Sequence, residues 1–226
     1  MSYTMPAWSY SSLTSFETCP YRYYMSKVKK EFPEQQTEAT LWGNRVHKSL
    51  ENAVATGSPL GAGMEQWQPI ADKFRKRFVD GARVLVEQKM AINKWYYPVE
   101  WGAEDAWCRG IADITVLGDE LAVSCDWKTG KRKTDTQQMK LMAGMIFAHH
   151  PQIKYVHTAF VWLKEGTTDK DKFEAEKKGE IWNEFIPRVA KMESAYTEDK
   201  WPKKPSGLCR GWCPVKSCTY WEPKRV

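Results

Sequence analysis

The chain has 226 residues, of which 42% are hydrophobic and 27% charged, so it can bury a core without disulfide staples. It has no apolar run of the roughly 20 residues that a membrane span requires. Its start, MSYTMPAWSYSS, lacks the basic end and apolar centre of a secretory signal. We therefore expect a single domain in the cytoplasm with no membrane partner, and the net charge of +6 is compatible with a polyanionic partner.

The first third of the chain is predicted to be helical. Residues 9–30 suggest two short helices separated at Pro20, a residue that suits the first turn of the second helix. Apolar residues recur at helical spacing over 41–54, and a second helix is expected over 65–82 after a loop at 57–63.

The middle of the chain is predicted to be a sheet. Residues 84–92 indicate a strand, and 95–101 a short strand or a loop. Two β-rich runs, 107–117 and 121–128, flank Gly118 and Asp119, which favour a tight turn, so we expect a hairpin there.

The last third returns to alternating elements. Residues 134–150 indicate a helix, with Thr134 and Gln137 at capping-box spacing. A strand over 154–163 is followed by a connection rich in lysine and acidic residues, and then by a helix over 179–196 in which Pro187 causes a kink or a later start. This order of elements indicates an α/β or α+β fold with a mixed sheet between helices.

The predicted hairpin brings together residues that suit a metal site. Asp126 and Lys128 point to one face of their strand, and the turn places Asp113 within about one position of Asp126 on the partner strand. Carboxylate oxygens are preferred ligands of Mg²⁺ and Mn²⁺, and the lysine could hold a phosphate. The alternative is an ordinary ion pair on a surface hairpin.

Further polar residues accompany this hairpin. Gly43 and His47 lie on one face of the predicted helix. The glycine would allow this helix to approach its neighbours closely. His47 could be a third metal ligand or an ordinary packed residue. Lys131, Arg132 and Lys133 form a basic cluster directly after the hairpin, which suits phosphate contacts or an ordinary solvated surface.

Six cysteines are present, and three of them crowd the end of the chain at Cys209, Cys213 and Cys218. In a reducing compartment, clustered cysteines suggest a metal before a disulfide. Cys108 and Cys125 lie inside the predicted strands and are expected to be core residues.

Four ordered motifs carry a resemblance to a known family. They are GNRVH at 43–47, GIAD at 110–113, DWKTG at 126–130 and QMKLM at 138–142. The chain thereby resembles the PD-(D/E)XK nuclease superfamily and its RecB-like iron–sulfur branch, which includes the CRISPR-associated nucleases of spacer acquisition and stand-alone relatives, some of them carried by phages. Met142 departs from the tyrosine usual in the last motif.

The resemblance implies a restriction-endonuclease-like α/β core at about 38–165, within a single domain spanning 1–226. It also implies a subdomain that joins both ends of the chain, about 1–30 and 200–226. There a [4Fe–4S] cluster, or alternatively a structural zinc ion, would be held by four cysteines. These are Cys19, Cys209, Cys213 and Cys218.

The function expected from the resemblance is a Mg²⁺- or Mn²⁺-dependent deoxyribonuclease for single-stranded DNA or DNA ends. We expect mainly exonuclease activity, and endonuclease activity is a second possibility. The expected process is DNA recombination, repair, replication or phage DNA processing. The expected metal ligands are His47, Asp113 and Asp126. Lys128 and Gln138 would assist the reaction, with Glu87 beside them, and Lys131, Arg132 and Lys133 would contact DNA.

Two other functions stay open, an iron–sulfur DNA-binding or adaptor protein without nuclease activity and a redox protein. Other recombination or replication proteins and a second copy of the chain are further candidate partners, and a phage-encoded chain would act in the host cytoplasm.

Overall fold

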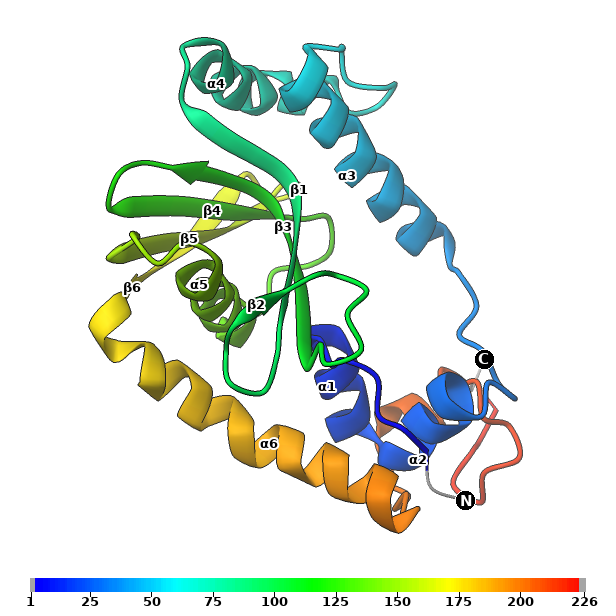
Figure 1. Ribbon diagram of the computed structural model, residues 1–226. Helices are drawn as coiled ribbons and strands as arrows, with labels where there is room; N and C mark the ends of the chain where they lie inside the picture. Colours follow the sequence, from blue (N-terminus) through cyan, green and yellow to red (C-terminus); the bar gives the residue numbers. More distant parts are fainter. Residues whose placement is uncertain (1–2, 224–226) are drawn as a thin grey trace. The chain divides into compact units, whose positions relative to one another are not determined.

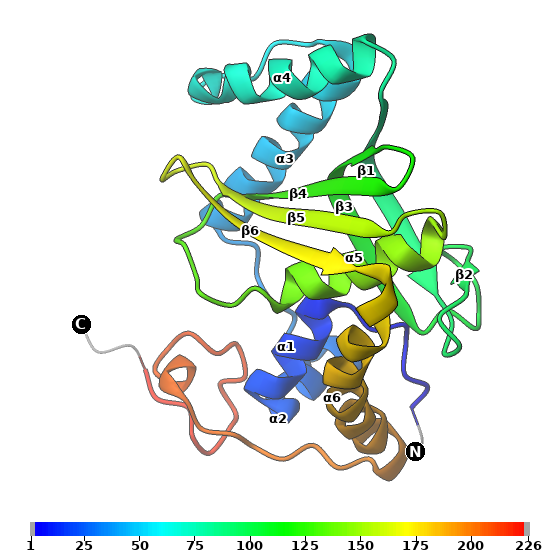
Figure 2. The same ribbon diagram turned by 90° about the vertical axis from the view of Figure 1, so that its left-hand side faces the viewer.

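The computed structural model describes residues 3–223, and the chain divides into two compact units. The larger unit comprises residues 37–183, and the smaller comprises residues 1–36 together with 184–226. Figures 1 and 2 show the elements of both units. Within the described residues, no helix is long and apolar enough to cross a membrane.

The larger unit is built on a six-stranded mixed sheet with the strand order β2-β1-β3-β4-β5-β6. Only β4 and β5 are parallel, and every other neighbouring pair is antiparallel. The strands are β1 (Arg83–Ile92), β2 (Pro98–Val99), β3 (Cys108–Leu117), β4 (Leu121–Lys128), β5 (Tyr155–Trp162) and β6 (Thr167–Glu174). The expected mixed sheet and the hairpin of β3 and β4 are both confirmed.

Helices cover the two faces of this sheet. Helix α3 (Glu38–Thr56), the turn η2 (Glu65–Trp67) and helix α4 (Gln68–Val79) contribute to a core on one face. Helix α5 (Gln137–His149) connects the parallel strands β4 and β5 across the other face. One core cluster of the described residues includes side chains of α3, β1, β3 and β4, namely Val46, Leu50, Val84, Ile114 and Trp127.

Helix α3 approaches the sheet closely, as the glycine at position 43 predicts. A Cβ atom on Gly43 would lie 3.2 Å from Thr129 Oγ1, just beyond the end of β4. The helix begins at the cap of Thr37, whose side chain accepts from the Thr40 N–H, and ends at Gly57 in the left-handed conformation.

Two local predictions were wrong, and one of two alternatives at Pro187 is excluded. The charged segment after β5 is the edge strand β6, in which Phe173 packs inward between exposed polar residues. Thr134 does not cap α5, because the helix begins at Gln137, and Thr136 at the cap position makes no side-chain capping bond. Pro187 lies inside α6 (Lys178–Glu198), so it does not delay the start of this helix, and a kink at Pro187 stays a prediction.

The smaller unit brings together segments from the two ends of the described chain. It contains α1 (Tyr10–Thr18), α2 (Pro20–Tyr23), the π-helical turn η1 (Tyr24–Val28), the part of α6 from Glu184 and the turn η4 (Gly207–Cys209). Trp201 stacks on Tyr24 with ring centres 4.8 Å apart, and the Tyr23 and Tyr196 hydroxyls are hydrogen-bonded at 3.1 Å. Glu17 accepts two hydrogen bonds from Arg188, at 2.6 and 2.7 Å. Such packed rings and a bidentate ion pair join the two segments without any covalent link.

Candidate active site

Three potential metal ligands converge on the face of the sheet below α3. Ligand atoms of His47, Glu87 and Asp113 all lie within 4.8 Å of one another. His47 comes from α3, Glu87 from β1 and Asp113 from β3. Asp113 is buried, and its Oδ1 is 3.3 Å from His47 Nδ1. Two carboxylates and an imidazole form a donor set that divalent ions such as Mg²⁺ and Mn²⁺ accept, so the residues fit such an ion.

Glu87 reaches this group through an unusual backbone conformation. The pairs Val86↔Ile114 and Gln88↔Ala112 on either side place Glu87 opposite Asp113. Its φ of 49° lies in the left-handed region, which is unfavourable for a residue with a side chain. Val86 belongs to the core below α3, whereas Gln88 contacts His150 at the end of α5. The left-handed residue therefore turns its carboxylate to the same face as the side chain before it.

Asp113 stands where β3 and β4 separate. Their ladder ends at Ile114↔Cys125, which puts Asp113 level with Asp126, within the one position that the sequence predicts. Beyond this point, the Trp127 N–H donates to Asp113 Oδ2 at 2.7 Å. A carboxylate thus takes the place of a carbonyl as the acceptor.

Asp126, Gln138 and Lys128 form a second connected group, on the side of α5. Gln138 Nε2 donates to Asp126 Oδ1, and Lys128 Nζ donates to Gln138 Oε1, both at 2.8 Å. Lys128 Nζ also lies 2.7 Å from Asp126 Oδ2 and 4.5 Å from the centre of the Phe160 ring. Because a lysine can only donate, it fixes which end of the Gln138 amide faces it. Gln138 thereby fixes the distance between the carboxylate and the ammonium group.

Asp126, Glu87 and His47 have shifted pKa values. Burial raises the pKa of Asp126 to about 6, despite the attraction of Lys128. Burial, followed by repulsion from Asp113, also raises the pKa of Glu87. For His47, burial lowers the pKa, but the hydrogen bond and charge of Asp113 outweigh it, so the pKa is raised. The site therefore gathers more negative charge than its surroundings neutralise, as expected where a cation binds.

The structure brings five predicted residues into two neighbouring groups: His47 and Asp113, and Asp126, Lys128 and Gln138. It also places a sixth residue, Glu87, among the possible metal ligands. The predicted ligands His47 and Asp113 share a group with Glu87, which the sequence placed only beside the site. Asp126 is outside this compact group, because its carboxylate is held by Gln138 and Lys128. No sequence motif predicts the left-handed conformation of Glu87. The proximity of Glu87 to His47 could therefore not be predicted from the positions of the two residues in the sequence.

The three residues of the basic cluster after β4, Lys131, Arg132 and Lys133, differ in their contacts. Arg132 forms an ion pair with Asp169 on β6, and its backbone N–H donates to Glu165. Lys131 and Lys133 are exposed. Arg132 is therefore engaged in holding the connection between β4 and α5 against the sheet, although its side chain is still 53% exposed, and the two lysines are exposed as well.

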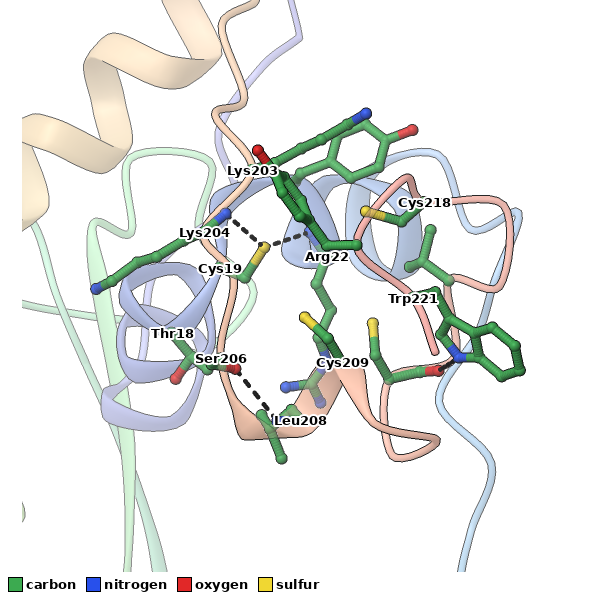
Figure 3. A pocket seen from close by; sticks show the side chains of 14 residues that line it. Thr18, Cys19, Arg22, Lys203, Lys204, Ser206, Leu208, Cys209, Cys218 and Trp221 are labelled. Atoms are coloured by element: carbon green, nitrogen blue, oxygen red, sulfur yellow. Dashed lines mark hydrogen bonds between the residues drawn. The ribbon is translucent and has the colours of Figure 1, made fainter. Parts of the chain in front are cut away.

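A pocket in the smaller unit is lined by four cysteines. Cys19, Cys209, Cys213 and Cys218 line one common pocket, and none of them forms a disulfide. Figure 3 shows the sulfur atoms of Cys19, Cys209 and Cys218 directed toward this common space.

The pocket also offers hydrogen bonds and positive charge to the sulfurs. Backbone N–H groups of Arg22 and Lys204 donate to Cys19 Sγ, at 3.4 and 3.5 Å. Burial raises the pKa of Cys213, and repulsion from Cys209 and Cys19 adds to it. Arg22, Lys203 and Lys204 line the cavity as well. Cys108 and Cys125 are buried in the larger unit, as predicted for core residues.

Comparison with known proteins identifies the class of this fold and site. A family model of the PD-(D/E)XK nuclease superfamily matches residues 7–218, and the chain therefore belongs to that superfamily. No curated protein matches the sequence. Among solved structures, the chain is similar to the "Putative exonuclease" from Eubacterium rectale, with 12% identity over 94% of this chain and 86% of that chain, and a TM-score of 0.55. That likeness shows a shared fold. The crystal structure of SSO0001 is 11% identical over 97% of this chain and 89% of that chain, with a TM-score of 0.49.

Proposed function

We propose that the chain is a Mg²⁺- or Mn²⁺-dependent deoxyribonuclease that acts on single-stranded DNA or DNA ends. The observation that carries the proposal is the metal-ligand group of His47, Glu87 and Asp113 beside the connected group of Asp126, Gln138 and Lys128. Membership in a nuclease superfamily supports the hydrolysis of phosphodiesters, and the name of the Eubacterium rectale protein favours an exonuclease.

The residues of the site have distinct roles in this proposal. A bound divalent ion lowers the pKa of water and stabilises charge on the phosphate. His47, Glu87 and Asp113 would hold the ion, and Asp126 would be a further ligand or a base close to it. Lys128 then donates to the phosphate or to the attacking oxygen, where its positive charge offsets the developing negative charge. Gln138 is a positioning residue, because it contacts Lys128 and Asp126 rather than the reacting atoms.

For the smaller unit, we propose a [4Fe–4S] cluster bound by Cys19, Cys209, Cys213 and Cys218, as in the RecB-like iron–sulfur branch. Four thiolates in one pocket suit such a cluster, and the N–H donors and cations around them offset its negative charge. Loading would tie the two segments of this unit together, so the energy of metal binding would also stabilise the fold.

The width of the pocket supports a cluster over the zinc alternative. Tetrahedral zinc with bonds of about 2.3 Å to sulfur places its sulfurs roughly 3.8 Å apart. Among residues 3–223, no three of the cysteine sulfurs lie within 4.8 Å of one another. The sulfurs are therefore not gathered as closely as a single zinc ion would hold them.

One experiment separates the nuclease from an iron–sulfur adaptor protein without activity. Purified protein is incubated with end-labelled single-stranded and duplex DNA in Mn²⁺ or EDTA, next to the Asp113→Asn variant. We expect Mn²⁺-dependent shortening of the single strand by wild type and none by the variant. Binding of DNA without cleavage in Mn²⁺ and in Mg²⁺ would favour the adaptor and contradict the proposal.

A further inference from the structure

Two positive side chains on the sheet lack acidic partners. Lys89 Nζ and the Arg109 guanidinium lie over the ring of Trp101, at 5.8 and 5.6 Å from its centre. Within the part of the chain that the structure describes, neither forms an ion pair with a carboxylate, and the buried Arg109 Nε has no hydrogen-bond acceptor. A buried guanidinium nitrogen without an acceptor carries a desolvation cost that an incoming anion would remove.

These cations lie on the same face of the sheet as the metal-ligand group. Arg109, Ile111 and Asp113 alternate along β3, and Lys89 is paired with Ile111 on β1. The intervening Gly110 faces α5, because a Cβ there would meet Met142 and Met145 at 3.9 Å. At about 6.7 Å for every two residues, Arg109 lies roughly 13 Å along the strand from Asp113. Ile111 between them is 38% exposed, so this stretch of the face is open to solvent.

The same two strands lead to exposed aromatic rings. Trp95 and Tyr97, in the connection from β1 to β2, are 71% and 68% exposed. Asn93 Oδ1 accepts from the backbone N–H of both residues at 3.1 Å, and Tyr96 between them stacks on Trp182 at 4.8 Å. The connection is therefore held in a defined conformation that leaves the two rings in water. Exposing such large apolar area has a cost, which a ligand that stacks on the rings would remove.

We propose that these residues form a binding track for one DNA strand, leading from the metal-ligand group to the β1–β2 connection. The track consists of Lys89, Arg109, Trp101, Trp95 and Tyr97. Lys89 and Arg109 bind the phosphates next to the reacting one, Trp101 positions the two cations, and Trp95 and Tyr97 stack on unpaired bases. The inference rests on the proposed nuclease function and adds to it the direction in which the substrate strand leaves the site.

This arrangement also accounts for a preference for single strands. Stacking on a protein ring requires a base whose face is free, and the bases of a duplex cover one another. Phosphate contacts alone would serve either form. The aromatic part of the track should therefore discriminate between single strand and duplex, and the cationic part should not.

Binding can be tested without cleavage. Anisotropy of a labelled oligothymidylate is measured over a salt series, in EDTA and in the Asp113→Asn background. Each lost single-strand phosphate contact lowers the slope of log K against log salt by about 0.7, so Lys89→Ala with Arg109→Ala should lower it by about 1.4. Trp95→Ala and Tyr97→Ala should each weaken binding roughly 5-fold or more with little change in slope. Lys172→Ala, on β6 at the other edge of the sheet, is the matched control and should leave the slope as it is.

The outcomes separate this inference from the function it rests on. A double variant whose slope equals that of Lys172→Ala would overturn the track, and so would aromatic variants that weaken duplex binding as much as single-strand binding. Cleavage of bis(p-nitrophenyl) phosphate in Mn²⁺ then tests the reaction centre alone. The ratio of kcat/KM on the oligonucleotide to that on this small diester should fall at least tenfold in the double variant. Failure of wild type on both substrates would contradict the nuclease while leaving the binding result intact.

Discussion

The Trp127 backbone N–H and the Asp113 carboxylate are joined by a hydrogen bond of 2.7 Å at the point where β3 and β4 part. This bond holds Asp113 Oδ2, so Oδ1 is directed to His47 and the metal-ligand group. Asp113 thus has a structural contact and a proposed metal contact on separate oxygens, and substitutions can separate them.

Asp113→Asn and Asp113→Ala should both abolish cleavage but differ in stability. The asparagine keeps an oxygen that can accept from the Trp127 N–H, whereas alanine leaves that buried donor unsatisfied at a cost of about 1–3 kcal/mol. Urea unfolding in EDTA measures the difference between the variants. Residual Mn²⁺-dependent cleavage near the wild-type rate in Asp113→Asn would contradict the assigned role.

Two substitutions at Glu87 should have the same effect on metal binding but different effects on stability. Glu87→Gly relieves the left-handed backbone, worth about 1–2 kcal/mol, and Glu87→Gln retains that strain. Both lose a carboxylate, so the rise in melting temperature on adding Mn²⁺ should shrink in each. In EDTA, the glycine variant should melt at a higher temperature than the glutamine variant. The reverse order would show that relief of the left-handed conformation is smaller than the conformational entropy that glycine loses on folding.

The stability of the metal-free protein should depend on pH through Asp126. Its pKa is raised to about 6 by burial, against an ordinary value of 3.8, so the native state binds this proton more tightly than the unfolded state. The contribution is present below about pH 4 and is lost as the pH rises to about 6, at most about 3 kcal/mol. Asp126→Asn should flatten this part of the curve of unfolding free energy against pH, measured in EDTA. An unchanged pH dependence in the variant would assign the titration to another group.

Lys128 and Gln138 should affect turnover to different degrees. Lys128→Ala removes the group that would face the phosphate, and kcat should fall by several orders of magnitude. Gln138→Leu leaves the lysine in place without its acceptor, and we expect a loss of about 10- to 100-fold, as for other positioning contacts of metal sites. The split between kcat and KM on a single strand measures both. If Gln138→Leu lost as much as Lys128→Ala, Gln138 would itself contact the substrate.

The cysteine pocket should be coloured when it is loaded. Protein purified without oxygen should show broad visible absorbance and about four iron atoms per chain. Serine in place of Cys19, Cys209, Cys213 or Cys218 should lower both the colour and the melting temperature, because an alcohol is a poor ligand for iron. Cys108→Ala is the control and should keep the colour. Stoichiometric zinc without iron would replace the cluster by a structural zinc site.

Much of the candidate site could be predicted from local sequence. Gly118 and Asp119 define a short turn, and a short turn limits the register, so Asp113 and Asp126 were expected to be neighbours. Gly43 predicted the close approach of α3. These predictions succeeded because each depends on a few residues close together in the chain.

Other features depend on interactions that no local pattern encodes. The left-handed conformation of Glu87 costs free energy by itself and is held by the strands on both sides, so propensity argues against it. Strand β6 carries charges on its exposed edge, and only Phe173 marks its inner face. Thr134 has the spacing of a cap, but the connection before α5 is held by Arg132 and Asp169 instead. The contacts of Lys89 and Arg109 with Trp101 join three segments and could not be foreseen.

The division of the chain has a consequence for how the protein is made. Cys19 belongs to the smaller unit, and its three companions follow the whole of the larger unit in sequence. During translation, the larger unit can fold before Cys209, Cys213 and Cys218 have been synthesised, since domains generally fold as units from the N-terminal side. Until then, Cys19 has no other cysteine of the pocket beside it. The four sulfurs can meet only after Cys218 has been synthesised. Loading of the pocket would therefore mark a chain that has been translated through its nuclease segment, and a prematurely terminated chain would remain colourless.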